Sequence, residues 1–291
     1  MLFFIVFLLL LLFAGIVGYS WYRLHKVIHI HATGGDKTPS DFDMSYDAVS
    51  FTTSDGIAIS GWYIPAKTPK AVVILSHGRV LRNSGKSLML PLARDLHTNN
   101  YSTLLFDMRS TGESKGNVID FGSKQWQDVV AAYRYAESLT AGQHIKIGFL
   151  GISQGGVASI IAAGKEKVGD FVIAITPFAT HSSLFAYQVA KEKVFPKFLF
   201  RWALQLAANI ELGLGYELYN ARNFIPQIKS PIFLISGKRD EIVNPKDAWI
   251  LYESAHNPKD YWEASTGHDV YGEKKEEYID KILHFLSVYT N

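Results

Sequence analysis

The feature that most constrains the fold is a G-x-S-x-G motif that follows a short apolar run. Gly151, Ser153 and Gly155 come directly after the run 145–150. A serine at the tip of a sharp strand-to-helix turn holds a strained backbone, and flanking glycines let the strand and the helix pass closely. The following residues, 156–164, are mostly small and end at a glycine, which indicates a tightly packed helix. The motif therefore predicts a strand, a turn and a helix, with Ser153 at the turn.

Apolar runs alternate with helical stretches along most of the chain. Five runs have the length and composition of strands buried on both faces: 71–76, 103–107, 145–150, 171–176 and 232–236. Helices are predicted between or after them at 86–96, 124–139, 158–163 and 274–288. Such alternation forms a mostly parallel sheet with helices on both faces, here of about eight strands.

Two further β-prone runs precede this alternation. They cover 48–52 and 57–64 and are separated by Ser54, Asp55 and Gly56, which is a hairpin signal. We expect both strands at one edge of the sheet.

The amino terminus indicates a membrane location. Residues 1–22 contain no charged side chain and are apolar over a length that spans a bilayer. A cleaved signal peptide is the alternative, but it normally has a basic first region and a small-x-small cleavage site, and neither is clear here. We therefore expect a retained single-pass anchor over 1–22 and a juxtamembrane linker over 23–44, with the Gly-, Pro- and Ser-rich part at 34–43.

The residues around the end of this span suggest its orientation. Tyr19, Trp21 and Tyr22 form an interfacial aromatic belt, and Arg23 and Lys26 follow directly. Because basic residues accumulate on the cytoplasmic side, we expect the folded domain in the cytoplasm.

Composition excludes several classes of site. The 29 basic and 27 acidic residues are scattered along the chain, so we expect no nucleic-acid partner. The absence of cysteine rules out disulfides, thiolate metal sites and a cysteine nucleophile. His25, His29 and His31 have nearly helical spacing but no carboxylate among them, so we expect no metal and no cofactor.

The alternation breaks over 180–223, where aromatic and leucine residues are frequent. Apolar stripes at helical spacing commonly serve only as packing surface. The functional interpretation is an inserted helical cap that walls an apolar substrate pocket above Ser153. Both interpretations predict helices in this segment.

A serine needs a base to take its proton and an acid to orient that base. Asp240 follows the late strand 232–236, and His268 lies in a glycine-containing loop before the last helix. We predict Ser153, Asp240 and His268 as nucleophile, acid and base, in that chain order. Glu241 is an alternative acid beside Asp240.

We predict structural rather than catalytic roles for the other acidic and imidazole side chains near these loops. We expect His77 to shape its loop rather than act as the base. Asp107 and Asp269 are expected to pair with Arg109 or with loop amides.

With these motifs in place, residues 45–291 resemble the alpha/beta-hydrolase superfamily. Besides the serine motif and the two loops, the segment 76–79 (Ser-His-Gly-Arg) is similar to an oxyanion-hole loop after the third strand. The segment 107–114 resembles the family's D-x-R-G-x-G-x-S sequence, with Ser110 in place of the first glycine. The resemblance implies oxyanion donors at the backbone N–H groups of Gln154 and Arg79, with Val80 as an alternative second donor.

Together these features predict a membrane-anchored serine hydrolase that forms an acyl-enzyme. We expect a small-molecule or lipid acyl substrate, cleaved at an ester or thioester bond, because the apolar insertion and the bilayer are near the site. A serine at the turn argues against the dehalogenase and epoxide-hydrolase branches, which use a carboxylate as the nucleophile.

A peptidase or aminopeptidase is the alternative enzyme, and it is less favoured because no propeller domain precedes the catalytic region. A non-catalytic binding protein is the alternative from another class, and the complete triad argues against it.

Overall fold

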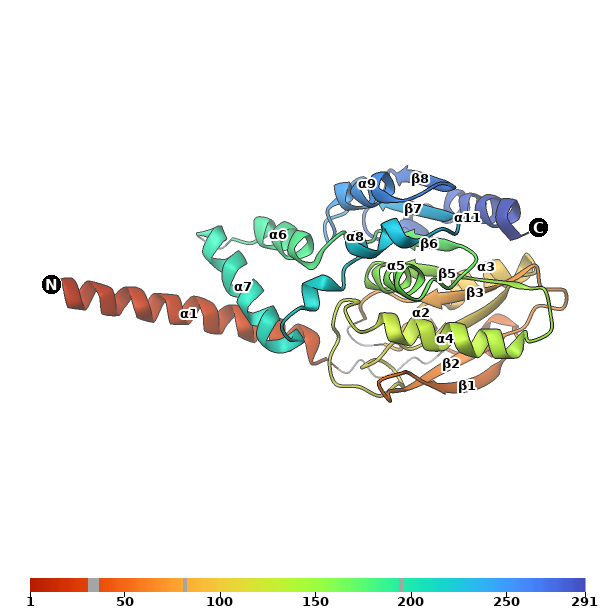
Figure 1. Cartoon of the computed structure of the whole chain (residues 1–291), viewed down its shortest axis with the longest axis horizontal. Helices are drawn as coiled ribbons and strands as arrows, with labels where there is room; N and C mark the ends of the chain where they lie inside the picture. The colour runs from red at the N-terminus through yellow and green to blue at the C-terminus, as the bar shows by residue number, and fades with distance from the viewer. Residues whose placement is uncertain (31–36, 81–82, 194–195, 291) are drawn as a thin grey trace.

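An eight-stranded sheet forms the centre of the α/β domain in the computed structural model, which describes residues 1–30, 37–80, 83–193 and 196–290 (Figure 1). The strand order is β1-β2-β4-β3-β5-β6-β7-β8. The strands are β1 Asp47–Thr52, β2 Ala58–Ile64, β3 Ala71–Ser76, β4 Ser102–Phe106, β5 Lys146–Ile152, β6 Val172–Ile175, β7 Ile232–Gly237 and β8 Lys259–Ala264. β1 and β2 pair antiparallel at one edge, and the pairs from β4 to β8 are parallel. This is the predicted mostly parallel sheet with an edge hairpin.

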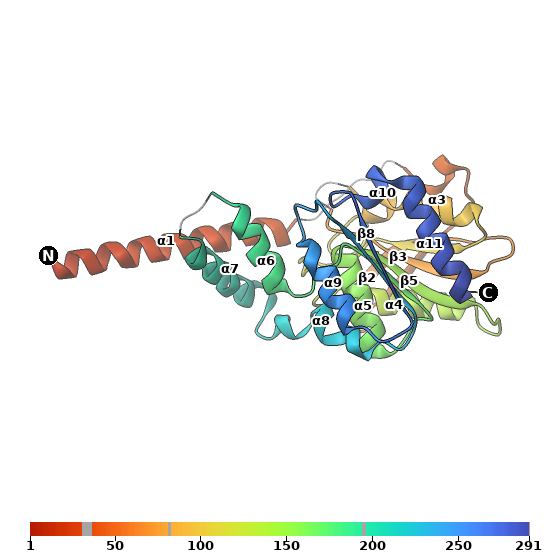
Figure 2. The same cartoon turned by 90° about the horizontal axis from the view of Figure 1, so that it is seen from above.

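Helices cover both faces of the sheet because its strands are apolar on both sides. On β3, Val72 and Ile74 belong to one buried core and Val73 and Leu75 to the other, as the two-residue period of a strand requires. The first core packs under α4 (Trp126–Leu139), α5 (Gln154–Glu166), α8 (Ala221–Phe224) and α9 (Pro245–Ser254). The second packs under α3 (Leu90–Thr98) and α11 (Lys275–Thr290) (Figure 2). The alpha/beta-hydrolase fold is thereby confirmed.

Two elements were not among the predicted runs. β8 has the sequence KDYWEA, whose charges suit an exposed edge strand and hide the apolar signal. α9 starts at Pro245, with the Asn244 side chain accepting a hydrogen bond from the Lys246 N–H at 3.2 Å. Short helices α2 (Gly85–Leu88) and α10 (Val270–Glu273) complete the loops near the site.

The N-terminal helix α1 runs from Leu2 to Ile28, so residues 23–28, expected in the linker, continue the helix. Leu24 and Ile28 are buried in the first core, and the Ile28 carbonyl accepts a hydrogen bond from the Ile119 N–H at 2.8 Å. The helix therefore extends because its last turns are part of the domain's packing. Of the predicted linker, residues 31–36 lie outside the described residues, and η1 (Pro39–Phe42) follows them.

The segment predicted as a cap is helical. It contains α6 (His181–Lys191), α7 (Lys197–Leu212) and η2 (Tyr216–Leu218), and η3 (Ile225–Gln227) follows α8. α7 lies beside α1 in both views (Figures 1 and 2), with the rings of Trp202 and Phe13 5.4 Å apart. A second pair of rings, those of Phe200 and Tyr19, lies 6.1 Å apart further along α1. The cap thus packs along the apolar N-terminal helix.

Candidate active site

Ser153 lies at the turn between β5 and α5 with φ 53° and ψ −120°, a left-handed conformation that is strained for a residue with a Cβ. The turn holds it there, since the Ser153 N–H donates to the Ile175 carbonyl at 2.7 Å. A Cβ on Gly155 would overlap the carbonyl oxygens of Ser76 and His77, and one on Gly151 would overlap the backbone of Gly155. The glycines therefore serve close passage of strand and helix, as the motif predicts.

Asp240 and His268 meet although 28 positions separate them. The His268 Nδ1–H donates to Asp240 Oδ2 at 2.6 Å. The other oxygen of this buried carboxylate accepts the N–H groups of Ile242 at 2.7 Å and Val243 at 2.9 Å. The carboxylate is thus fixed by its own loop, and it holds the imidazole with Nε2 unprotonated and able to accept a proton.

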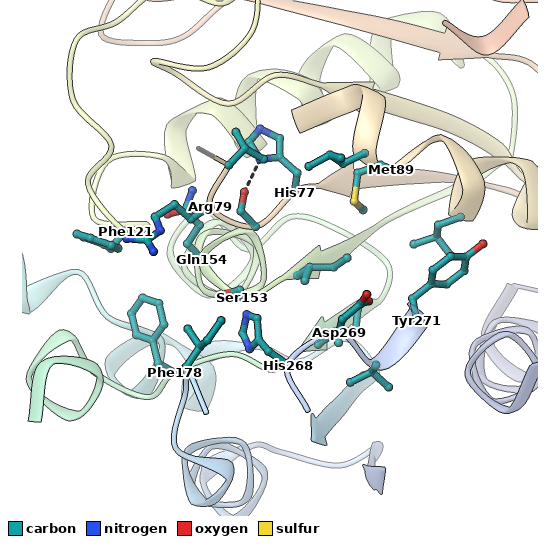
Figure 3. Close-up of a pocket in the computed structure, with 18 of the residues that line it drawn as sticks. His77, Arg79, Met89, Phe121, Ser153, Gln154, Phe178, His268, Asp269 and Tyr271 are labelled. Atoms are coloured by element: carbon teal, nitrogen blue, oxygen red, sulfur yellow. Dashed lines mark hydrogen bonds between the residues drawn. The ribbon is translucent and has the colours of Figure 1, made fainter. Parts of the chain in front are cut away.

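Ser153 and His268 line the same cavity, and Figure 3 shows the imidazole next to the serine. They arrive there from two loops at the carboxyl ends of parallel strands, β5 for Ser153 and β8 for His268. Such strand ends meet along one edge of an α/β sheet, where ligands bind in this class of fold. The structure therefore brings the three predicted residues together; Glu241 beside Asp240 is exposed.

His77 uses both ring nitrogens to hold its loop. Its Nε2 accepts the Met108 N–H at 2.9 Å, and its Nδ1–H donates to the Gly78 carbonyl at 2.6 Å. Burial lowers the pKa of His77, so the ring is neutral. Neither nitrogen is left for a reacting proton, which agrees with the predicted structural role.

The two residues predicted as oxyanion donors lie near the nucleophile, one at the start of α5 and one on the loop after β3. Gln154 is the first residue of α5, where backbone N–H groups have no partner within the helix. Arg79 follows Gly78 on the loop after β3, and a Cβ on Gly78 would contact the Ser153 Cβ at 3.5 Å. Both residues line the cavity that contains Ser153 (Figure 3).

The segment after β4 braces this loop through ion pairs that the sequence did not indicate. Asp107 accepts the Lys86 N–H at 3.1 Å and pairs with its ammonium at 3.2 Å. Arg109 pairs instead with Asp128 and Asp55, both at 2.7 Å. Asp107 therefore takes the loop-amide role predicted for it but not the Arg109 partner, because Arg109 turns toward α4.

Two other predicted details of the loops can be located. Ser110, which replaces the usual glycine, has φ 67°, so the turn keeps its glycine-like conformation with a serine in it. Asp269 caps α10 by accepting the Gly272 N–H at 2.8 Å, which is the loop-amide contact predicted for it.

The cavity at Ser153 has a volume of about 520 Å³ and predominantly apolar walls. Its walls include Leu88, Met89, Leu92, Phe178, Leu184 and Ile242. A second cavity of about 100 Å³ lies between α1, α6 and α7 and shares Arg79, Phe121 and Gln188 with the first. No local sequence pattern indicates that α1 forms a wall beside the site, because that contact depends on the return of the chain through α6 and α7.

Comparison with known proteins places the chain among serine hydrolases. The sequence pattern of the prolyl oligopeptidase family matches residues 118–291. The uncharacterized protein YqkD of Bacillus subtilis is 27% identical over 263 residues, which covers 87% of this chain and 83% of YqkD. YfhR of Escherichia coli O157:H7, also uncharacterized, is 26% identical over 256 residues, covering 84% of this chain and 81% of YfhR. Among solved structures, the Pyrococcus furiosus esterase Pf2001 has a TM-score of 0.75 and 25% identity, covering 91% of this chain and 99% of the esterase.

Proposed function

We propose that this chain, which belongs to the prolyl oligopeptidase family and is a serine hydrolase, cleaves carboxylic ester or thioester bonds of lipophilic acyl substrates. The observation that carries the proposal is the hydrogen-bonded Asp240–His268 pair beside Ser153 in an apolar cavity. The structural likeness to an esterase over 91% of the chain supports the ester assignment.

The proposed chemistry follows from the positions of these groups. His268 Nε2 takes the Ser153 hydroxyl proton while Oγ attacks the acyl carbonyl. The Gln154 and Arg79 N–H groups hold the oxyanion, and the protonated His268 donates to the leaving alkoxide or thiolate. His268 then takes a proton from water, whose oxygen attacks the acyl-enzyme carbonyl. The imidazolium returns that proton to Ser153 Oγ as the acyl–oxygen bond breaks, which releases the acid and free Ser153. Asp240 stabilises the imidazolium in both halves.

The lipophilic substrate class is inferred from the walls around the site. The cavity at Ser153 and the cavity against α1 share three lining residues, so the two cavities adjoin each other, and we infer that the path of the acyl chain from the N-terminal helix to the nucleophile runs through both. Leu24, Val27 and Phe200 line the α1 end of that path. The 26 residues of α1 from Phe3 to Ile28 form a segment long and apolar enough to span a membrane. An acyl chain that leaves a bilayer alongside α1 would meet mainly apolar walls in both cavities, with Arg79 and Gln188 beside Phe121 where the cavities adjoin.

Fluorophosphonate labelling of washed membranes tests the nucleophile. We expect wild type and Ser138→Ala, whose serine is exposed on α4, to be labelled and Ser153→Ala to be unlabelled. Labelling of Ser153→Ala, or no labelling of a folded wild type, would contradict the proposed mechanism and favour a binding protein.

Substrate comparison tests the bond that is cleaved. A peptidase is the second candidate, since the family whose pattern matches is named for oligopeptidases. We expect p-nitrophenyl esters to be hydrolysed with kcat/KM rising from acetyl to longer acyl chains, and aminoacyl or prolyl p-nitroanilides to be poor substrates. The reverse order would establish the peptidase, with the same Ser153 nucleophile.

A further inference from the structure

The N-terminal helix and the cap meet at a cluster of two imidazoles and one carboxylate. His25 lies in the last turn of α1 and His29 follows its end, and Glu211 lies near the end of α7, more than 180 positions away. His25 Nδ1 is 2.9 Å from Glu211 Oε1, and His29 Nε2 is 3.0 Å from Oε2. Glu211 supplies the carboxylate that the histidine cluster lacks in sequence, whereas His31 lies outside the described residues.

The hydrogen bond on the far side of His29 fixes its tautomer. Its Nδ1 is 3.1 Å from the Asn117 carbonyl, which can only accept, so Nδ1 carries the proton. In the neutral ring Nε2 then has a lone pair, and it faces a carboxylate oxygen that also has only lone pairs to offer. Two acceptors 3.0 Å apart repel each other unless a proton or a cation lies between them. The contact therefore requires either a proton or a cation between the two atoms.

The arrangement of His29 matches that of a metal-bound histidine. Ligating imidazoles characteristically donate their second N–H to a carbonyl or carboxylate, which orients the ring and the free nitrogen. The three ligand atoms lie within 4.8 Å of one another, and tetrahedral zinc ligands at about 2.0–2.2 Å from the metal stand roughly 3.3 Å apart. Small side-chain rotations bring the three atoms to that spacing. The histidine side chains are 41% and 32% exposed, which leaves room for water as a fourth ligand.

We propose that His25, His29 and Glu211 bind a divalent cation of the zinc class that fastens the end of α1 to cap helix α7. Two imidazoles and one carboxylate are a donor set that zinc accepts in proteins. The site lies beyond the aromatic residues Tyr19 to Tyr22, away from the most apolar part of α1. Its role is structural: it fixes the cap, and with it the second cavity, relative to the N-terminal helix.

Metal titration of the full chain tests the site. Protein purified in detergent is stripped with a chelator, and Zn²⁺ is added against a competing indicator, with bound metal measured by mass spectrometry. We expect one equivalent to bind to the wild type and to His256→Ala, a matched change of an exposed histidine outside the cluster. His25→Ala and His29→Ala should bind more than about tenfold more weakly, since even loss of an outer hydrogen-bond partner costs 10- to 100-fold.

A second readout separates metal binding from other causes. We expect Zn²⁺ to raise the melting temperature of the wild type and of His256→Ala but not of His29→Ala, because ligands that bind only the native state stabilise it. Co²⁺ should give the absorption bands of a tetrahedral site in the wild type but not in His25→Ala or His29→Ala. Equal zinc binding in His29→Ala, or no saturable binding by a folded wild type, would overturn the proposal. Stabilisation by acid with no zinc binding would instead assign the positive charge to a proton on His29.

Discussion

At the scale of single residues, the site depends on side chains whose positions are fixed by their own loops. Asp240 illustrates this: one carboxylate oxygen is held by the amides of Ile242 and Val243, and the other receives His268 Nδ1–H. The carboxylate that we propose as the acid of the triad is thus held in place by the protein itself. The neighbouring Glu241 is exposed and offers a control at the adjacent position.

Asp240→Asn should lower kcat for ester hydrolysis by up to about 10⁴-fold with little change in fold, because an amide can favour the wrong imidazole tautomer. Glu241→Gln should leave kcat within about twofold. Steady-state kinetics with a p-nitrophenyl ester measure both. A large loss in Glu241→Gln with none in Asp240→Asn would move the acid to Glu241.

Gly155→Ala should destabilise the domain by about 1–3 kcal/mol, the usual cost of overpacking, and abolish fluorophosphonate labelling. The added Cβ would overlap the carbonyl oxygens of Ser76 and His77, which belong to the backbone and cannot rotate away. Urea unfolding and labelling measure the two effects. Unchanged stability would show that strand and helix can separate there.

Stability should fall as the pH drops below about 6.5, in part because of His77. Burial lowers the pKa of His77 below its ordinary value of 6.5, so in this range the unfolded chain binds a proton that the native state does not. The resulting loss of folding stability is at most about 1.4 kcal/mol per pH unit for one group. It is absent at pH values above the pKa of this histidine in the unfolded chain. Urea midpoints between pH 5 and 8 should show a shallower acid slope for His77→Gln than for the wild type; equal slopes would contradict this.

At the scale of elements, α1 has two parts with different environments. Side chains from Phe3 to Phe13 are exposed on the protein, as a membrane-spanning segment requires, whereas Leu24 and Ile28 are buried in the domain core. Cleavage of a signal sequence beyond Ile28 would remove core side chains. This packing supports our proposal that α1 is retained as an anchor.

Leu24→Ala should therefore destabilise the domain by about 2–5 kcal/mol, the range for buried leucines, while Leu8→Ala, at a 48% exposed position, should change stability by less than about 0.5 kcal/mol. Denaturant unfolding in detergent measures the difference. Mass spectrometry of the mature amino terminus should find residues before Leu24 still attached. A mature chain that begins after Ile28 would contradict the retained anchor.

At the scale of the whole molecule, the N-terminal helix projects away from the sheet and the cap lies along it (Figure 1). Several apolar side chains of the cap and its following loop are exposed, among them Phe198, Trp202, Ile210 and Leu214. Exposed apolar groups beside a helix that we propose as a membrane anchor suit contact with lipid. We predict a cytoplasmic domain because the basic residues Arg23 and Lys26 follow the apolar part of α1.

The natural absence of cysteine makes this topology measurable with one substitution. Gln143→Cys places a thiol in an exposed loop after α4. If the domain is cytoplasmic, a membrane-impermeant maleimide should label this variant only after cells are lysed. Labelling of intact cells would place the domain outside.

The sequence by itself determined the fold class, the hairpin at the sheet edge and the three loops that carry Ser153, Asp240 and His268. These features depend on local patterns: apolar runs of strand length, a turn signal at Ser54–Gly56, and short loops at strand ends that a parallel sheet places along one edge. β8 was not predicted, because an edge strand need not be apolar on both faces and therefore lacks the apolar run of a central strand. Tertiary structure alone decided the partners of Arg109, the wall that α1 adds to the site and the meeting of Glu211 with His25 and His29. Each of these is a contact between segments far apart in the chain, and only the path of the folded backbone brings such segments together.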